Sequence, residues 1–165
     1  MTDVELPPGI RAATVDDADD VLRLVRELAE YERGLDSVKN TPELIREWLF
    51  GEHAVASALV AEVEGRVVGI AVWFPTYSTW TGVPGIHLED LFVEPGHRGS
   101  GFGKGFLVAL SRIAVARGYQ RVEWVVLDWN TPSIEFYEAL GARPMKEWHT
   151  YRLTGDPLTT LAGAS

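Results

Sequence analysis

Apolar residues along the chain switch between two spacings, and these spacings predict helices and strands. From Ala18 to Ala29 they recur every three or four positions, which is the spacing of one face of a helix. Asp16 and Asp17 come just before them, where acidic residues favour a helix start. A second helix is predicted from Thr41 to Gly51, because its proline suits a first helical turn.

Strand-like apolar runs account for much of the remaining chain. They are expected at Ile10–Ala13, Ala56–Val63, Val67–Phe74, Ile86–Val93, Arg121–Leu127 and Trp148–Leu153. Glu64-Gly65 separates two of these runs and predicts a hairpin turn. Further helices are predicted from the glycine cluster at 99–105 onward and over Pro132–Leu140. This mixed order predicts an α+β fold (α/β sandwich) with an antiparallel hairpin half and a βαβ half.

Length, composition and charge narrow the class of protein. A chain of 165 residues without repeats or linkers is expected to form a single domain over residues 1–165. Cysteine is absent, which excludes disulfides, thiolate metal sites and an acyl-cysteine intermediate. The net charge of -9 argues against a nucleic-acid module and favours the approach of a cationic small molecule.

The sequence also bears on membranes and location. No apolar stretch approaches the length needed to span a bilayer. The first eight residues carry Asp3 and Glu5 and lack the basic and apolar regions of a secretory signal. We therefore expect a cytoplasmic protein with no membrane partner.

The most informative motif lies where the run ending at Val93 meets a glycine-rich helix start. Glycines let successive amide groups converge, and a helix N-terminus adds partial positive charge, so the segment predicts a cradle for a pyrophosphate. The dinucleotide pattern G-x-G-x-x-G fails in every register, and the triphosphate loop needs serine or threonine where the chain has Gly105. The alternative is a helix start without a ligand, which so many glycines would weaken.

What remains is Val93-x-Pro95 followed by Arg98-x-x-Gly101-x-Gly103, which resembles the acyl-CoA-binding signature of the GNAT N-acetyltransferases. Within the GNAT proteins the chain resembles the diamine (spermidine/spermine) acetyltransferases, especially their thialysine Nε-acetyltransferase branch. Five blocks carry this resemblance: Leu24–Glu32, Tyr77–Trp80, Leu88–Val93, Val126–Asn130 and Phe136–Ala142. It implies the GNAT fold, a mixed and mostly antiparallel central sheet flanked by helices and splayed at the acetyl-CoA cleft.

The resemblance implies where acetyl-CoA would bind. The strand before the cradle would offer main-chain groups to pantetheine, the cradle would hold the diphosphate, and a second strand-to-helix connection would line the other side of the cleft. The implied residues are Leu91, Phe92, Val93, Arg98, Gly99, Ser100, Gly101, Phe102, Gly103, Lys104, Asn130 and Ser133. Asn130 and Ser133 are equally well explained as helix caps.

Acetyl transfer to an amine needs a neutral amine, a stabilised oxyanion and a proton for the leaving thiolate. The resemblance implies that Tyr137 protonates the sulfur of CoA and that Glu89 is a candidate general base, acting directly or through water. The alternative for Tyr137 is a core tyrosine of an amphipathic helix. Direct transfer in a ternary complex agrees with the absence of cysteine.

Glu89 and Asp90 are adjacent acids inside an apolar strand. Neighbouring strand residues face opposite sides unless a bulge intervenes, so at least one of the two acids is expected to be partly buried. Asp90 is equally well explained as a structural acid. The alternative for the pair is an edge strand with solvated carboxylates.

The resemblance also implies residues that contact the amine: Tyr31, Glu32, Ser78, Trp80, Glu89 and Glu147. Ser78 stands where the polyamine enzymes carry an aspartate, as in the thialysine-type members. Without that carboxylate a distal ammonium group loses an ion-pair partner, which favours a smaller amine. The segment around Gly82–Gly85 is one residue longer than in the family.

We therefore expect an acetyl-CoA-dependent N-acetyltransferase that acts on a primary amine of a small cationic substrate, namely thialysine, a diamine or a polyamine. A homodimer is expected from the resemblance alone. The alternatives are a CoA-binding sensor without catalysis and a GNAT enzyme acting on protein or peptide amines. No metal is expected, because the four histidines lack metal-ligand spacing.

Overall fold

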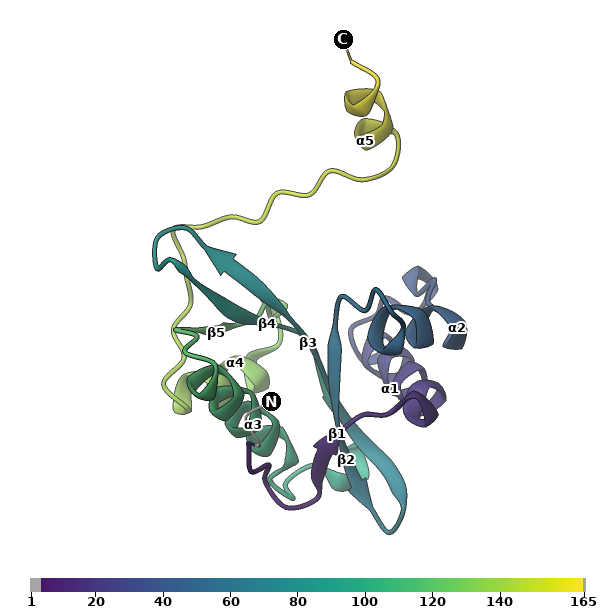
Figure 1. The fold of residues 1–165 in the computed structure, drawn as a ribbon, viewed down its shortest axis with the longest axis vertical. Coiled ribbons are helices and arrows are strands. Elements are labelled where there is room, and N and C mark those ends of the chain that lie inside the picture. The colour runs from purple at the N-terminus through teal and green to yellow at the C-terminus, as the bar shows by residue number, and fades with distance from the viewer. Residues whose placement is uncertain (1–3, 165) are drawn as a thin grey trace. The chain divides into compact units, whose positions relative to one another are not determined.

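A five-stranded sheet organises the first of two compact units in the computed structural model, which describes residues 4–164 (Figure 1). The units meet in the sequence between Val125 and Val126. The strands follow one another across the sheet in chain order: β1 (Ile10–Ala12), β2 (Ser57–Val63), β3 (Arg66–Ser78), β4 (Val83–Val93) and β5 (Val122–Glu123). Neighbours from β1 to β4 are antiparallel, whereas β5 is parallel to β4. The predicted fold class and mixed, mostly antiparallel sheet are confirmed.

Helices cover both faces of this sheet (Figure 1). On one face lie α1 (Ala18–Tyr31) and α2 (Pro42–Ile45), which continues as a π-helical turn at Arg46–Phe50. On the other face lies α3 (Phe102–Ala116). The helices predicted for these three regions are confirmed. None of the helices within residues 4–164 is long and apolar enough to cross a lipid bilayer.

Alternation of side chains along β3 explains how both faces pack. Ile70 and Val72 belong to a buried core that includes Val21 of α1. Gly69 allows α3 to approach the opposite face, because a Cβ there would lie 3.2 Å from the ring of Phe106. The apolar run Val67–Phe74 is therefore continuous rather than alternating, because both faces of the strand are covered.

The hairpin turn predicted at Glu64-Gly65 is confirmed. Both residues have positive φ angles, 50° and 77°, which a two-residue type I′ turn requires. This turn sets the antiparallel pairing of β2 with β3, in which Val63 lies opposite Arg66.

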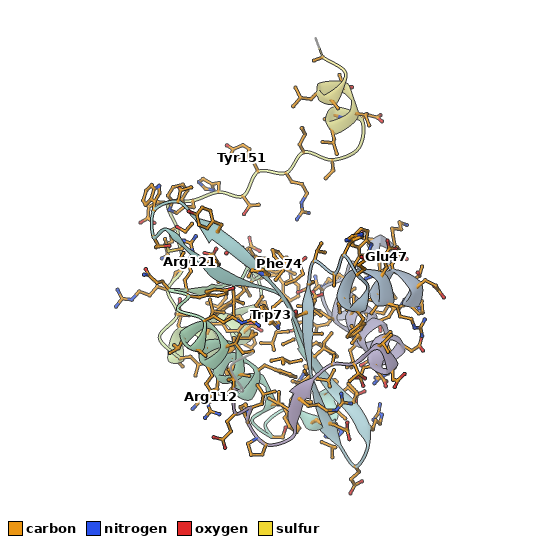
Figure 2. The ribbon with its side chains drawn as sticks, viewed as in Figure 1. Glu47, Trp73, Phe74, Arg112, Arg121 and Tyr151 are labelled. Atoms are coloured by element: carbon orange, nitrogen blue, oxygen red, sulfur yellow. The ribbon has the colours of Figure 1, made fainter. Side chains whose placement is uncertain are left out.

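The second unit contains α4 (Thr131–Ala139) and α5 (Gly155–Ala162). The helix predicted at 132–140 is confirmed by α4, whereas α5 is an addition to the predicted elements. The predicted strand Trp148–Leu153 is wrong, since that segment is extended without strand pairing, and the strand predicted at Arg121–Leu127 shortens to β5. Side chains over 148–153 are exposed, and Tyr151, at 94% exposure, projects from the segment (Figure 2). Alternating apolar residues make a strand only where a partner strand accepts its hydrogen bonds.

Candidate functional site

The connection between β4 and α3 brings amide groups together at a helix start. Gly99 and Gly101 have φ angles of 83° and 89°, the left-handed region that favours glycine. The first hydrogen bond of α3 runs from the Gly105 amide to the Gly101 carbonyl at 2.8 Å. The amide groups of residues 102–104 precede that bond and lie at the N-terminal end of a 15-residue helix. Such an end attracts an anion such as a phosphate.

Some residues in the glycine-rich segment are explained by packing or local hydrogen bonding rather than by ligand binding. A Cβ at Gly105 would lie 2.8 Å from Cδ1 of Ile10, so glycine there allows α3 to pack against β1. The ring of Phe102 packs beside Gly9, where a Cβ would come within 2.9 Å of it. The hydroxyl of Ser100 donates to the His97 carbonyl. Phe102 and Ser100 therefore offer a ligand mainly their main-chain groups.

Two exposed cations, Arg98 and Lys104, flank this connection. The Nε of Arg98 donates to the Val93 carbonyl at 3.1 Å. The guanidinium carbon lies 5.4 Å from the centre of the Tyr31 ring and 5.6 Å from that of Phe92. Positive charge therefore stands beside the helix start in a protein with a net charge of -9.

The edge of β4 next to the cradle is open. β5 pairs with β4 only where Ile86 lies opposite Val122 and His87 opposite Glu123. Within the described residues, the segment Leu91–Val93 has no strand partner on that edge. The Val93 carbonyl accepts a hydrogen bond from Nε of Arg98. The other main-chain groups along this edge can bind an extended ligand.

A buried carboxylate that the sequence analysis did not single out anchors the cradle. Oε1 of Glu94 accepts hydrogen bonds from Arg23 of α1 at 2.5 Å and from Arg66 of β3 at 2.7 Å. Arg23 also donates to the Val67 carbonyl at 2.8 Å. These bonds tie the start of the cradle to a helix and a neighbouring strand. The sequence signal that could have identified Glu94 is an acidic residue placed directly after a buried strand.

Replacing Glu94 with alanine is expected to lower the free energy of unfolding by about 2 kcal/mol, because two charge-assisted hydrogen bonds are lost. Urea denaturation followed by circular dichroism measures this change. Glu52→Ala, at an exposed turn position, is the control and should change stability by less than about 0.5 kcal/mol. Equal stabilities of the two variants would contradict the anchoring role.

A β-bulge brings acidic residues together on β4. The ladder pairs Trp73 with Leu88 and Val72 with Asp90, which leaves Glu89 as the extra residue. Glu89 is exposed and Asp90 is half-buried. The expectation that at least one acid is partly buried is confirmed, and the bulge is the exception to strict alternation.

The carboxyl groups around this bulge influence one another. Burial raises the pKa of Asp90 to about 6, and the nearby carboxylates of Glu89 and Glu32 act in the same direction. Partial burial also raises the pKa of Glu32, directly after α1. Glu89 Oε2 lies 3.5 Å from Nε2 of His87. Three acids from two elements thus form an acidic cluster, defined as Glu32, Glu89 and Asp90, where a cation would relieve repulsion.

Three other residues expected to contact the amine lie elsewhere in the first unit. Tyr31 is the exposed last residue of α1. Ser78 ends β3 and is buried, and its hydroxyl accepts a hydrogen bond from the Thr81 amide at 3.3 Å. Trp80 lies in the following turn and is 88% exposed. Ser78 thus has a structural function in the turn between β3 and β4.

Four predicted site residues belong to the second unit. Asn130 precedes α4 and is buried, but its side chain makes no capping hydrogen bond. Ser133 lies inside the first turn of α4, so capping explains neither residue. Tyr137 is half-buried on α4, with its ring 5.4 Å from that of Phe136. Glu147 is exposed.

Comparison with known proteins identifies the family. The sequence profile of the acetyltransferase (GNAT) family matches residues 21–142. The chain belongs to this family. A thialysine N-epsilon-acetyltransferase of Sus scrofa is 39% identical over 165 residues, covering 93% of this chain and 96% of its own. An L-ornithine N5-acetyltransferase of Arabidopsis thaliana is 44% identical over 95 residues, covering 58% of this chain and 42% of its own.

The fold is similar to that of solved structures as well. An integron cassette protein from the mobile metagenome of V. cholerae matches with a TM-score of 0.79 and 25% identity, covering 94% of this chain and 97% of its own. The predicted GNAT family and fold are therefore confirmed, and the chain is an acetyltransferase. Its family uses acetyl-CoA as the acetyl donor. Within residues 4–164, no group of three or more histidine and acidic side chains is arranged to hold a metal ion.

Proposed function

We propose that this protein transfers the acetyl group of acetyl-CoA to a primary amine of a small cationic substrate, with thialysine the first candidate among amino-acid, diamine and polyamine acceptors. The observation that carries this proposal is the acidic cluster of Glu32, Glu89 and Asp90, in which the β-bulge of β4 places two acids side by side and the Glu32 carboxylate acts on Asp90 from the end of α1. Relatives named for thialysine and ornithine acetylation support the same substrate class.

The donor side of the site consists mainly of main-chain groups. Acetyl-CoA supplies the thioester that reacts with the amine. Main-chain groups at the open edge of Leu91–Val93 exchange hydrogen bonds with the pantetheine arm of acetyl-CoA. The amides of residues 99–104 hold the diphosphate of acetyl-CoA. Arg98 and Lys104 add charge, and the family resemblance assigns Asn130 and Ser133 to the coenzyme as well. Support comes from the left-handed glycines and from the unpaired edge of β4.

The acceptor side attracts and deprotonates the amine. The acidic cluster binds the ammonium form, and Glu89 removes a proton directly or through one water, so that a neutral nitrogen attacks the thioester carbonyl. Tyr31, Trp80 and Glu147 contribute further contacts. Ser78 provides no carboxylate for a distal ammonium group, which supports an acceptor smaller than spermine.

Tyr137 donates the proton that the leaving thiolate needs. Transfer is direct within a ternary complex, since the chain has no cysteine to carry an acetyl group. Residues 1–165 act as one GNAT domain, and the family match across the boundary at 125 and 126 supports this. The resemblance also supports a homodimer, for which sedimentation should report twice the mass of the chain.

A mass-spectrometric screen with acetyl-CoA tests the proposal. Thialysine, ornithine, lysine, putrescine and spermidine are offered separately, and we expect the highest kcat/KM for one of the amino acids. Binding of CoA without turnover of any amine would instead favour the sensor alternative. Turnover of peptides but not of free amines would favour the peptide-acetylating alternative.

Replacing Glu89 with glutamine is expected to flatten the rise of kcat/KM with pH, because the side chain no longer accepts a proton from the bound amine. Initial rates between pH 6 and 9 measure this effect. Glu123→Gln on β5 is the control and should keep the wild-type profile. Superimposable profiles for Glu89→Gln and the wild type would rule out Glu89 as the base.

A further inference from the structure

The side chain of Arg98 connects two parts of the site that are far apart in the sequence. Its guanidinium lies over the ring of Tyr31, at the end of α1, at 5.4 Å. The same group donates from Nε to the carbonyl of Val93, at the end of β4. Arg98 therefore links the cradle to the end of α1 through a cation–π contact and a main-chain hydrogen bond.

These contacts leave the guanidinium able to bind an anion. Among the side-chain nitrogens of Arg98, only Nε has a hydrogen-bond acceptor within residues 4–164. Arg23 and Arg66, by contrast, are both bound to the carboxylate of Glu94. The N–H groups on Nη1 and Nη2 of Arg98 thus remain available, and their planar geometry matches two phosphate oxygens.

The other end of this link reaches the acidic cluster. Tyr31 is followed directly by Glu32, whose carboxylate raises the pKa of Asp90 together with burial and Glu89. Holding the Tyr31 ring therefore fixes the last turn of α1 beside a carboxylate of the cluster. A change in the mobility of Arg98 therefore affects the position of Glu32, where the amine binds.

We propose that Arg98 couples the two binding sites, so that occupation of the cradle by the CoA diphosphate strengthens binding of the amine. This rests on the proposed function and adds a residue that links its two binding sites. The diphosphate binds the Nη1 and Nη2 groups while the same guanidinium stays over the Tyr31 ring. The bound diphosphate immobilises the exposed guanidinium and with it the Tyr31 ring. Binding of the amine then no longer includes the entropy cost of ordering Tyr31.

Calorimetry with CoA, which has no acetyl group to transfer, and thialysine measures this coupling. In the wild type, the Kd for thialysine should fall about 2- to 5-fold at saturating CoA, the scale of an exposed cation–π contact. By linkage, thialysine should lower the Kd for CoA by the same factor. A mismatch between these two factors would contradict a binding equilibrium between the sites.

Two variants remove the link from opposite ends. Arg98→Lys keeps a charge for the diphosphate but loses the planar group over Tyr31, and Tyr31→Leu removes the ring. In both variants the ratio of thialysine Kd values without and with CoA should fall to about 1. Each ratio compares two Kd values of the same variant. The contribution of a direct contact between Tyr31 and the amine is present in both values and cancels from the ratio.

Arg117→Lys is the matched control, since the guanidinium of Arg117 lies 5.2 Å from the ring centre of Trp73 and touches neither Tyr31 nor Phe92. Its ratio should equal that of the wild type. A wild-type ratio in Arg98→Lys and Tyr31→Leu would overturn the coupling, as would a ratio of 1 in the wild type. Failure of the wild type to bind CoA would instead overturn the proposed function, so the two failures are distinguishable.

Discussion

Tyr137→Phe is expected to lower kcat by about 10²-fold or more while leaving the KM for the amine nearly unchanged. Phenylalanine keeps the ring that packs near Phe136 but has no hydroxyl to protonate the leaving thiolate. A loss confined to kcat indicates an interaction made in the transition state. Steady-state rates at saturating acetyl-CoA, with the amine varied, measure both constants.

Tyr151→Phe is the control for this variant. It removes the same hydroxyl from a tyrosine that is 94% exposed in the segment before α5. Its kcat should equal that of the wild type. If Tyr137→Phe also kept the wild-type kcat, Tyr137 would have no part in the chemical step and would only be a packing residue of α4.

Asp90→Asn is expected to raise the free energy of unfolding of the protein and also to raise its KM for the amine. Burial raises the pKa of Asp90 to about 6, so ionising this carboxyl in the folded state costs free energy. Asparagine has no charge to bury, and at pH 7.5 the variant should gain about 1–3 kcal/mol in the free energy of unfolding. The amine loses an ionic partner, and its KM should rise about 10- to 100-fold.

The stabilisation by Asp90→Asn depends on pH in a defined direction. With the folded pKa near 6 and an unfolded pKa of about 3.9, the folded wild type binds more protons between these values. The stability of the wild type at this site therefore falls as pH rises from about 4 to 6 and is constant above. The gain from Asp90→Asn should be small near pH 4, grow up to pH 6 and then stay level.

Urea denaturation at pH 4.5 and pH 7.5 measures that difference. Asp36→Asn, at an exposed position outside the acidic cluster, should give equal changes at both pH values. If the gain for Asp90→Asn were the same at both values, burial of a titrating carboxyl would not be its cause. The variant also separates binding from chemistry, since its effect falls on KM and that of Tyr137→Phe on kcat.

Local sequence determined the elements and the cradle. The helix over Ala18–Tyr31 follows from its 3.6-residue spacing, and the turn at Glu64-Gly65 from two residues that tolerate positive φ. The glycine-rich start of α3 could also be predicted, because left-handed backbone at Gly99 and Gly101 is a property of those residues themselves. The family signature lies in the same short stretch, which is why the acetyltransferase family was predicted.

Only the tertiary structure decided which side chains meet. The bulge at Glu89 depends on how β3 pairs with β4, and the raised pKa of Asp90 depends on burial beneath elements distant in sequence. The anchor at Glu94 and the contact of Arg98 with Tyr31 likewise join residues that no spacing rule connects. The strand predicted at 148–153 fails for the same physical reason. Periodicity describes the side chains of one segment, whereas strand pairing, burial and charge interactions depend on the segments that fold against it.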